Sequence, residues 1–223
     1  MNEEVYITHW SGTQIGQKPG VRAKYFGRDW EAAQFDTPLP PEHVFDAIRK
    51  VTNGITLTRE ELPEAASVWN EKAFARKKDL FAVGGFYAVK GKTAEIMAQF
   101  DFGEGGLVPM PLYGPDLETP WPEPCWWINF GASKNCLVAA ESKDLSLVGK
   151  PDKPANELLW SYYGACEDGS IAVTPAALSG ADLWTERQLR RVIFMSGRLR
   201  NALLAAKVRP KTDTHRARIV EGM

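Results

Sequence analysis

The residues of this chain that could perform chemistry are scattered and lack the spacings that catalysis or metal binding requires. His9, His43 and His215 show neither an HExxH pattern nor paired-ligand spacing, so we expect structural or exposed histidines and no metal site. A GxxxxGK[ST] phosphate loop and a GxSxG nucleophile elbow are both missing from the sequence. The sequence therefore predicts no catalytic residue and no bound cofactor.

The cysteines also lack the spacing of a disulfide framework or a metal site. Cys125, Cys136 and Cys166 are odd in number and have no CxxC spacing, so neither a disulfide framework nor a zinc site is indicated. They are typical of buried thiols in a reducing compartment. A Cys–His pair could form only through tertiary proximity, and a small cytoplasmic enzyme of unknown reaction stays an alternative.

Two acidic loops carry the charges that could bind a partner. DFGEGG at 101–106 and YGPDLETPWPEP at 113–124 place carboxylates among glycines and prolines. A basic partner, such as a nuclease that must itself hold a polyanion, would be attracted to these loops by electrostatic steering. The predicted partner-binding residues are Asp101, Glu104, Asp116, Glu118, Trp121 and Glu123.

The composition is that of a folded protein with an uneven charge distribution. The 223 residues are 44% hydrophobic and 25% charged, as in average globular domains. Residues 183–223 hold ten Lys and Arg against three Asp and Glu, a net +7 that leaves −8 elsewhere. We interpret this charge as mostly solvated, with an RNA-binding accessory role as an alternative. The start, MNEEVYITHW, has no signal-peptide pattern, which predicts a cytoplasmic protein without a membrane partner.

Apolar periodicity predicts an α+β fold, with mixed sheets and flanking helices. We expect strands at 5–10, 55–58, 79–83, 86–90, 158–166 and 192–195, a hairpin of 125–130 with 135–142, and helices at about 41–51, 59–77, 92–102 and 199–206. The apolar run VIFM at 192–195 suits a central strand. Six prolines in 107–124 indicate a linker or a long exposed loop. The chain is predicted to be one domain, 1–223, with a mobile basic tail at 209–223.

The sequence of segment 171–208 is weakly repeated at about 55–102. Ile, Thr, Leu, Trp and Glu recur in the same order in both, and 86–102 aligns with 192–208 without gaps, placing Gly91 on Gly197. Such an internal repeat is typical of a duplicated strand–helix unit, in which each copy buries its apolar face by packing against the other. It predicts two sub-units at about 41–124 and 125–208, with chance similarity as the alternative.

The run IAVTPAALSGADLWTERQLRRVIFMSGRLRNALLAAKV resembles the closing part of the eleventh immunity-protein family of bacterial polymorphic toxin systems, formerly a domain of unknown function. The pattern consists of a Thr-led turn, Gly180-x-x-x-Trp184, a strand ending Phe194-x-Ser196 and a Leu-rich helix. Segments 79–113 and 126–145 are similar to the middle of that family, so about 40–208 is covered. The chain departs from the family at Lys90-Gly91, where a Ser-led turn is usual.

The resemblance implies a non-enzymatic, cytoplasmic immunity protein. Members of the family are encoded beside a toxin and are expected to neutralise it by binding. The toxin is delivered by type VI or another contact-dependent secretion. Because the matching residues look structural, the resemblance implies no catalytic residue, cofactor or metal. A complex of this kind typically buries about 1,600 Å².

Overall fold

The computed structural model describes residues 4–8, 20–32, 42–76, 79–149, 152, 154, 157–162, 167–207 and 214–221. Within these ranges the protein is α+β, with several sheets and four α-helices, as predicted. The helices are α1 Glu42–Thr52, α2 Glu71–Ala75, α3 Gly91–Met97 and α4 Gly197–Ala205. Short 3₁₀ turns, η1 Ala139–Glu141 and η3 Pro175–Leu178, lie between strands.

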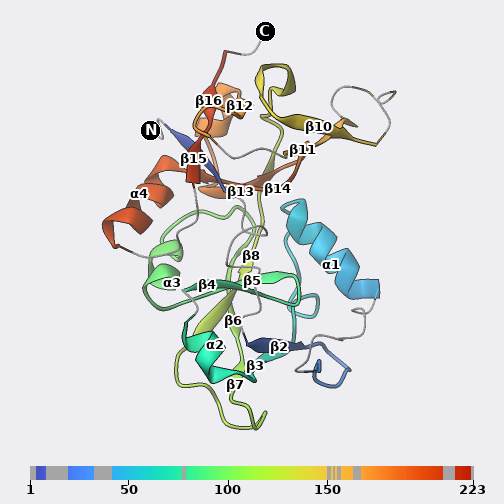
Figure 1. The fold of residues 1–223 in the computed structure, drawn as a ribbon, viewed down its shortest axis with the longest axis vertical. Coiled ribbons are helices and arrows are strands. Elements are labelled where there is room, and N and C mark those ends of the chain that lie inside the picture. The colour runs from blue at the N-terminus through green and yellow to red at the C-terminus, as the bar shows by residue number, and fades with distance from the viewer. Residues whose placement is uncertain are drawn as a thin grey trace.

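The largest sheet has seven strands and fills the upper half of Figure 1. Its path is β10–β11–β14–β1–β15, and β13 pairs with both β14 and β9. The strands are β1 Val5–Thr8, β9 Ser133–Lys134, β10 Leu145–Val148, β11 Leu159–Tyr162, β13 Leu183–Glu186, β14 Leu189–Ser196 and β15 Thr214–Arg216.

Smaller sheets make up the rest of the fold, mostly below the first sheet (Figure 1). One has the order β4–β5–β8–β6, a second β2–β3–β7, and β12 pairs with β16 near the top of the molecule. The strands are β2 Val21–Lys24, β3 Ala65–Val68, β4 Leu80–Val83, β5 Phe86–Lys90, β6 Gly106–Met110, β7 Leu112–Tyr113, β8 Cys125–Asn129, β12 Ala172–Val173 and β16 Arg218–Ile219.

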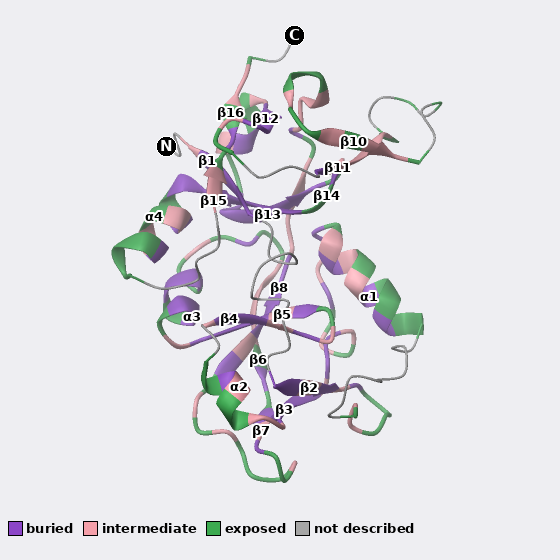
Figure 2. Cartoon of the chain, viewed as in Figure 1, coloured by how far each residue is buried: buried purple, intermediate pink, exposed green. Residues whose placement is uncertain are grey.

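Strand β14 separates the two hydrophobic cores. Side chains alternate across a strand, so Val192 and Phe194 pack into the upper core while Ile193 and Met195 pack into the lower one. Both faces are buried over residues 192–196, whereas Arg190 and Arg191 at the start of β14 are exposed, and much of the β14 ribbon is purple (Figure 2). A strand buried on both faces must be apolar throughout, and the prediction of a central strand at 192–195 is confirmed.

Two hairpin–helix units share one geometry. The hairpin β4–β5 continues into α3 and the hairpin β13–β14 into α4, and the helices begin at Gly91 and Gly197, the pair that the sequence comparison matched. The earlier parts of the two repeated segments differ in structure, because Trp184 lies inside β13 whereas Trp69 follows β3. A common origin of the two units stays a prediction.

In each unit, the backbone carbonyl of an aspartate accepts a hydrogen bond from the last residue of the second strand. The backbone N–H of Lys90, the last residue of β5, donates to the carbonyl of Asp79 at 2.8 Å, and that of Ser196 donates to the carbonyl of Asp182 at 2.8 Å. Both aspartate carboxylates turn toward the helix that follows. Asp79 accepts from the Thr93 hydroxyl at 3.0 Å, and Asp182 from that of Ser196.

The prediction for 55–77 was wrong. Residues 55–58 form no strand, and instead of a helix over 59–77 the chain makes a turn, the strand β3 and the short helix α2. The expected capping interaction is present, since the Thr58 N–H donates to the Glu61 carboxylate at 3.1 Å. Pro63 follows within the turn, and AASV at 65–68 gains strand partners on both sides, from β2 and β7. Tertiary pairing overrides the local helix signal.

Two further segments differ from expectation. The proline-rich stretch contains β6 and β7, and Pro109 is accommodated because β6 is an edge strand, whose outward side needs no N–H donor. Strand β8 pairs with β5 and β6 rather than with 135–142, so the predicted hairpin was wrong. The basic tail contains β15 at 214–216 and β16 at 218–219, while 209–213 lie outside the described residues, and the mobility of the tail stays a prediction.

Candidate functional site

The loop after β7 presents two of the predicted carboxylates on a well-defined turn. The Asp116 carboxylate accepts the backbone N–H groups of Glu118 and Thr119, at 3.2 and 3.0 Å, and the Thr119 hydroxyl. The bond from that hydroxyl lowers the pKa of Asp116. Gly114 and Thr119 close the turn by a backbone bond of 2.8 Å. We call residues 114–119 the acidic turn; its Asp116 and Glu118 side chains are exposed.

An aromatic pair lies at the base of the acidic turn. The ring of Trp30 meets that of Tyr113 edge to face, with centroids 6.1 Å apart, and Tyr113 bridges to Pro120 across the turn. The Arg22 guanidinium and the Lys24 ammonium each lie 5.9 Å from the Trp30 ring. Trp, Tyr and Arg are the residue types that dominate binding energy at protein interfaces, and here the two rings are half-buried.

Sequence reasoning missed this aromatic pair. The stretch around Trp30 carries no motif, and its Tyr113 partner is far away in the chain. The two meet because β2 and β7 both pair with β3. Only the strand pairing, which spacing along the chain does not show, brings them together.

The other predicted binding residues are placed differently. Trp121 packs edge to face on buried Phe74, with centroids 5.6 Å apart, and Glu123 forms an ion pair with Lys90 at 2.6 Å. Asp101 and Glu104 are exposed but lie beyond the far end of the β6–β8 ladder. The structure thus brings Asp116 and Glu118 together on the acidic turn and leaves Asp101 and Glu104 apart from them.

The loop at 101–106 is fixed by backbone contact. Glu104 donates its N–H to the Gly131 carbonyl at 3.1 Å, and Gly103 bridges to the same residue. A Cβ built on Gly131 would stand 1.8 Å from the Gly105 nitrogen, so only glycine permits this approach. These glycines serve close packing of two loops.

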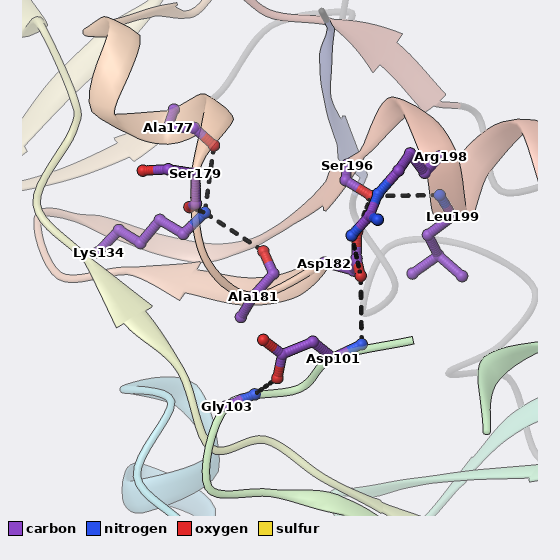
Figure 3. A network of polar contacts seen from close by, with 10 residues as sticks. All are labelled: Asp101, Gly103, Lys134, Ala177, Ser179, Ala181, Asp182, Ser196, Arg198 and Leu199. Atoms are coloured by element: carbon purple, nitrogen blue, oxygen red, sulfur yellow. Dashed lines mark hydrogen bonds and ion pairs between the residues drawn. The ribbon is translucent and has the colours of Figure 1, made fainter. Parts of the chain in front are cut away.

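Asp101 also belongs to a polar network around Asp182 (Figure 3). Asp182 is 1% exposed, and its carboxylate accepts the Asp101 N–H at 3.2 Å, the Ser196 hydroxyl at 2.5 Å and Arg198 Nη2 at 2.8 and 2.9 Å. Burial by itself raises the pKa of Asp182, but the bonds from Ser196, Asp101 and Arg198 outweigh it and lower the pKa. The network ties β13, α4 and the 101–106 loop together.

Lys134 forms a second set of polar contacts, which Figure 3 also shows. Its Nζ donates to the carbonyl groups of Ala177, Ser179 and Ala181, at 3.1, 2.7 and 3.3 Å, and lies 3.4 Å from the centroid of the Trp184 ring. Desolvation lowers the pKa of this ammonium. With three carbonyls for its three donors, Lys134 holds the turn at 177–181 in place.

The described cysteines and histidines form no reactive pair. Burial raises the pKa of Cys125 to about 12 and also raises that of Cys136, so both thiols stay protonated near neutral pH. His43 is exposed on α1 and His215 lies on β15, whereas His9 and Cys166 fall outside the described residues. In the described ranges, no three His, Cys, Asp or Glu side chains gather as metal ligands.

Glu186 is a buried acid without a cationic hydrogen-bond partner among the described contacts. It is 2% exposed and accepts the backbone N–H groups of Cys136 at 2.8 Å and Gln188 at 3.4 Å. Burial raises its pKa from 4.5 to about 7. Folding therefore binds a proton at mildly acidic pH, and stability that is present below about pH 4.5 is lost as pH rises through 7.

Replacing Glu186 by glutamine is expected to remove this pH dependence. The wild type should lose about 3 kcal/mol of unfolding free energy, relative to Glu186→Gln, as pH rises from 4.5 to above 7. Urea unfolding across this pH range measures the difference. Glu118→Gln, at an exposed acid, serves as the control and should follow the wild type. Parallel profiles for Glu186→Gln and wild type would contradict the assignment.

No protein-family model matches this chain, and no curated protein matches it. In the part of the chain that the structure describes, no helix has both the length and the apolar character needed to cross a membrane.

Proposed function

We propose that this protein is an immunity protein that binds and neutralises a cognate secreted bacterial toxin, with a nuclease as the first candidate. The observation that carries the proposal is the acidic turn with the Trp30–Tyr113 pair at its base. The sequence resemblance points to the same function. The proposed toxin-binding surface consists of Trp30, Tyr113 and the acidic turn.

The physical basis is preorganisation combined with charge complementarity. The Asp116 carboxylate is bonded to two backbone N–H groups of its own turn, so little conformational entropy is lost when a partner binds. Half-buried aromatic rings can become the buried centre of an interface, surrounded by a polar rim. Exposed carboxylates beside them attract a basic protein and speed its association.

Occlusion is the mode of neutralisation that fits a nuclease. Such an enzyme holds its polyanionic substrate in a positively charged cleft. The Glu118 carboxylate is exposed on the turn and could enter that cleft in place of a phosphate, while Asp116, bonded to the turn itself, adds negative charge beside it. Substrate would then be excluded without any reaction at the immunity protein.

Co-expression with the toxin encoded beside this gene tests the proposal. The wild type should restore growth and form a complex with the toxin. Trp30→Ala should weaken the complex by about 30-fold or more, as loss of an interface hot spot does, and Glu118→Lys should mainly slow association. Glu42→Lys reverses an exposed acid on α1 and is the matched control, with binding unchanged. Failure of the wild type to rescue growth and to form a complex would overturn the proposal.

A further inference from the structure

A cleft of about 680 Å³ is lined by residues of α4, β15 and β16. These elements lie at the end of the molecule opposite β7 and the acidic turn that follows it (Figure 1). Three arginines, Arg198, Arg216 and Arg218, contribute to its lining. Glu4, Asp168 and Asn201 are the other side chains of the lining that carry a charge or an amide. The volume is in the range of small-molecule sites.

The sequence THRARI explains how two of the arginines reach the same cleft. Residues two apart in an extended segment face the same side, and Arg216 at the end of β15 and Arg218 at the start of β16 both line the cleft. Ala217 between them also borders the cleft but is 4% exposed and packs in the upper core. The Ala217 N–H donates to the carbonyl of Val5, which anchors this segment to β1. The third arginine, Arg198, stands in the first turn of α4.

Carboxylates hold each guanidinium in position. Arg198 pairs with Asp182, Arg216 with Glu4 at 3.3 Å, and Arg218 with Glu141 at 3.3 Å. The described bonds of Arg198 to Asp182 use Nη2, and that of Arg216 to Glu4 uses Nη1. Arg218 donates to Glu141 through both Nη1 and Nη2. A guanidinium has five N–H donors, so donors remain for a ligand. The side chains of Arg198 and Arg216 are 61% and 56% exposed, which makes these donors accessible.

We propose that this cleft binds a small phosphorylated ligand, with the phosphate among Arg198, Arg216 and Arg218. A phosphate monoester offers three oxygens and up to two negative charges, which match three guanidiniums that arrive from different elements. A single carboxylate would need only one guanidinium fork. Glu4 and Glu141 hold Arg216 and Arg218 only through exposed ion pairs, which are weak, so a phosphate can replace these carboxylates on the two guanidiniums. The lining holds no aromatic side chain on which bases of a single-stranded nucleic acid could stack.

Isothermal titration with inorganic phosphate and pyrophosphate tests the proposal, with citrate and a single-stranded RNA as comparison ligands. Arg216→Gln and Arg218→Gln are each expected to weaken pyrophosphate binding about tenfold or more, because hydrogen bonds to a charged group are lost. Arg216→Lys keeps the charge without the fork and should fall between wild type and Arg216→Gln. Arg49→Gln, at an exposed arginine of α1, is the matched control and should bind like the wild type.

These variants keep the test separate from folding. Arg216 and Arg218 form exposed ion pairs, which typically contribute at most about 1 kcal/mol, so we expect melting temperatures close to that of the wild type. Arg198 is left unchanged because it also bonds to the buried Asp182. The proposal is overturned if neither phosphate nor pyrophosphate binds saturably at millimolar concentration, if Arg216→Gln and Arg218→Gln bind pyrophosphate like Arg49→Gln, or if only citrate or RNA binds.

Discussion

Replacing Trp184 by alanine is expected to lower the free energy of unfolding by about 3–5 kcal/mol. The side chain is 1% exposed and stacks on Phe194, with ring centroids 5.7 Å apart and planes 23° from parallel. Its removal leaves a cavity in the upper core and takes the ring away from the Lys134 ammonium, a contact of 3.4 Å. Chemical denaturation followed by circular dichroism measures the loss.

Two variants make the Trp184 result specific. Trp184→Phe keeps an aromatic ring and removes an indole N–H that is buried without a partner among the described residues, so its cost should be much smaller. Trp126→Ala truncates a tryptophan that is only half-buried. If Trp184→Ala were no more destabilising than Trp126→Ala, the packing role assigned to Trp184 would be wrong.

Replacing Asp182 by alanine is expected to cost about 2–4 kcal/mol, because charge-assisted hydrogen bonds are lost at a buried position. The Ser196 hydroxyl would lose its acceptor, and so would the Asp101 N–H. Asp79 occupies the corresponding place in the other hairpin–helix unit but is half-buried, with the Thr93 side chain as its partner. Asp79→Ala is therefore the matched control and should cost less.

The pH dependence of Asp182→Asn provides a second measurement. Because the folded-state pKa of Asp182 is lowered, the stability that it contributes is present above its unfolded pKa near 3.8 and is lost as pH falls through the folded value. Asp182→Asn should reduce this loss of unfolding free energy at low pH, which is the acid limb of the stability profile. Glu186 acts in the opposite direction at higher pH, so the two variants report on separate limbs. An unchanged acid limb in Asp182→Asn would contradict the assignment.

The sequence predicts well the elements in which local and tertiary preferences agree. The run at 192–195 is apolar because both of its faces are buried, and Gly84 and Gly85, both at positive φ, form the turn between β4 and β5. Helix α1 also lies within one residue of the predicted range 41–51, although its buried side consists of Val44, Ala47 and Val51 while Phe45 is exposed. In each of these segments, the residues along the chain carry the information.

Other elements depend on partners distant in the chain. The segment 65–68 is a strand because β2 and β7 lie on either side of it, which its alanines do not reveal. The same holds for the candidate binding surface: Asp116 and Glu118 are recognisable as loop carboxylates, but their neighbour Trp30 is placed by the sheet. Glu123 pairs with Lys90 on β5, and no spacing along the chain indicates that contact.

The position of β1 has a consequence for folding in the cell. This strand lies between β14 and β15, and the nearby ion pair of Glu4 with Arg216 joins residues 212 positions apart. During synthesis, β1 leaves the ribosome long before either of its neighbours exists. The seven-stranded sheet must therefore assemble largely after translation of this region, through contacts of high sequence separation that make folding slow. Until then both edges of Val5–Thr8 remain open to pairing with other chains, so nascent chains of this protein are expected to depend on chaperones.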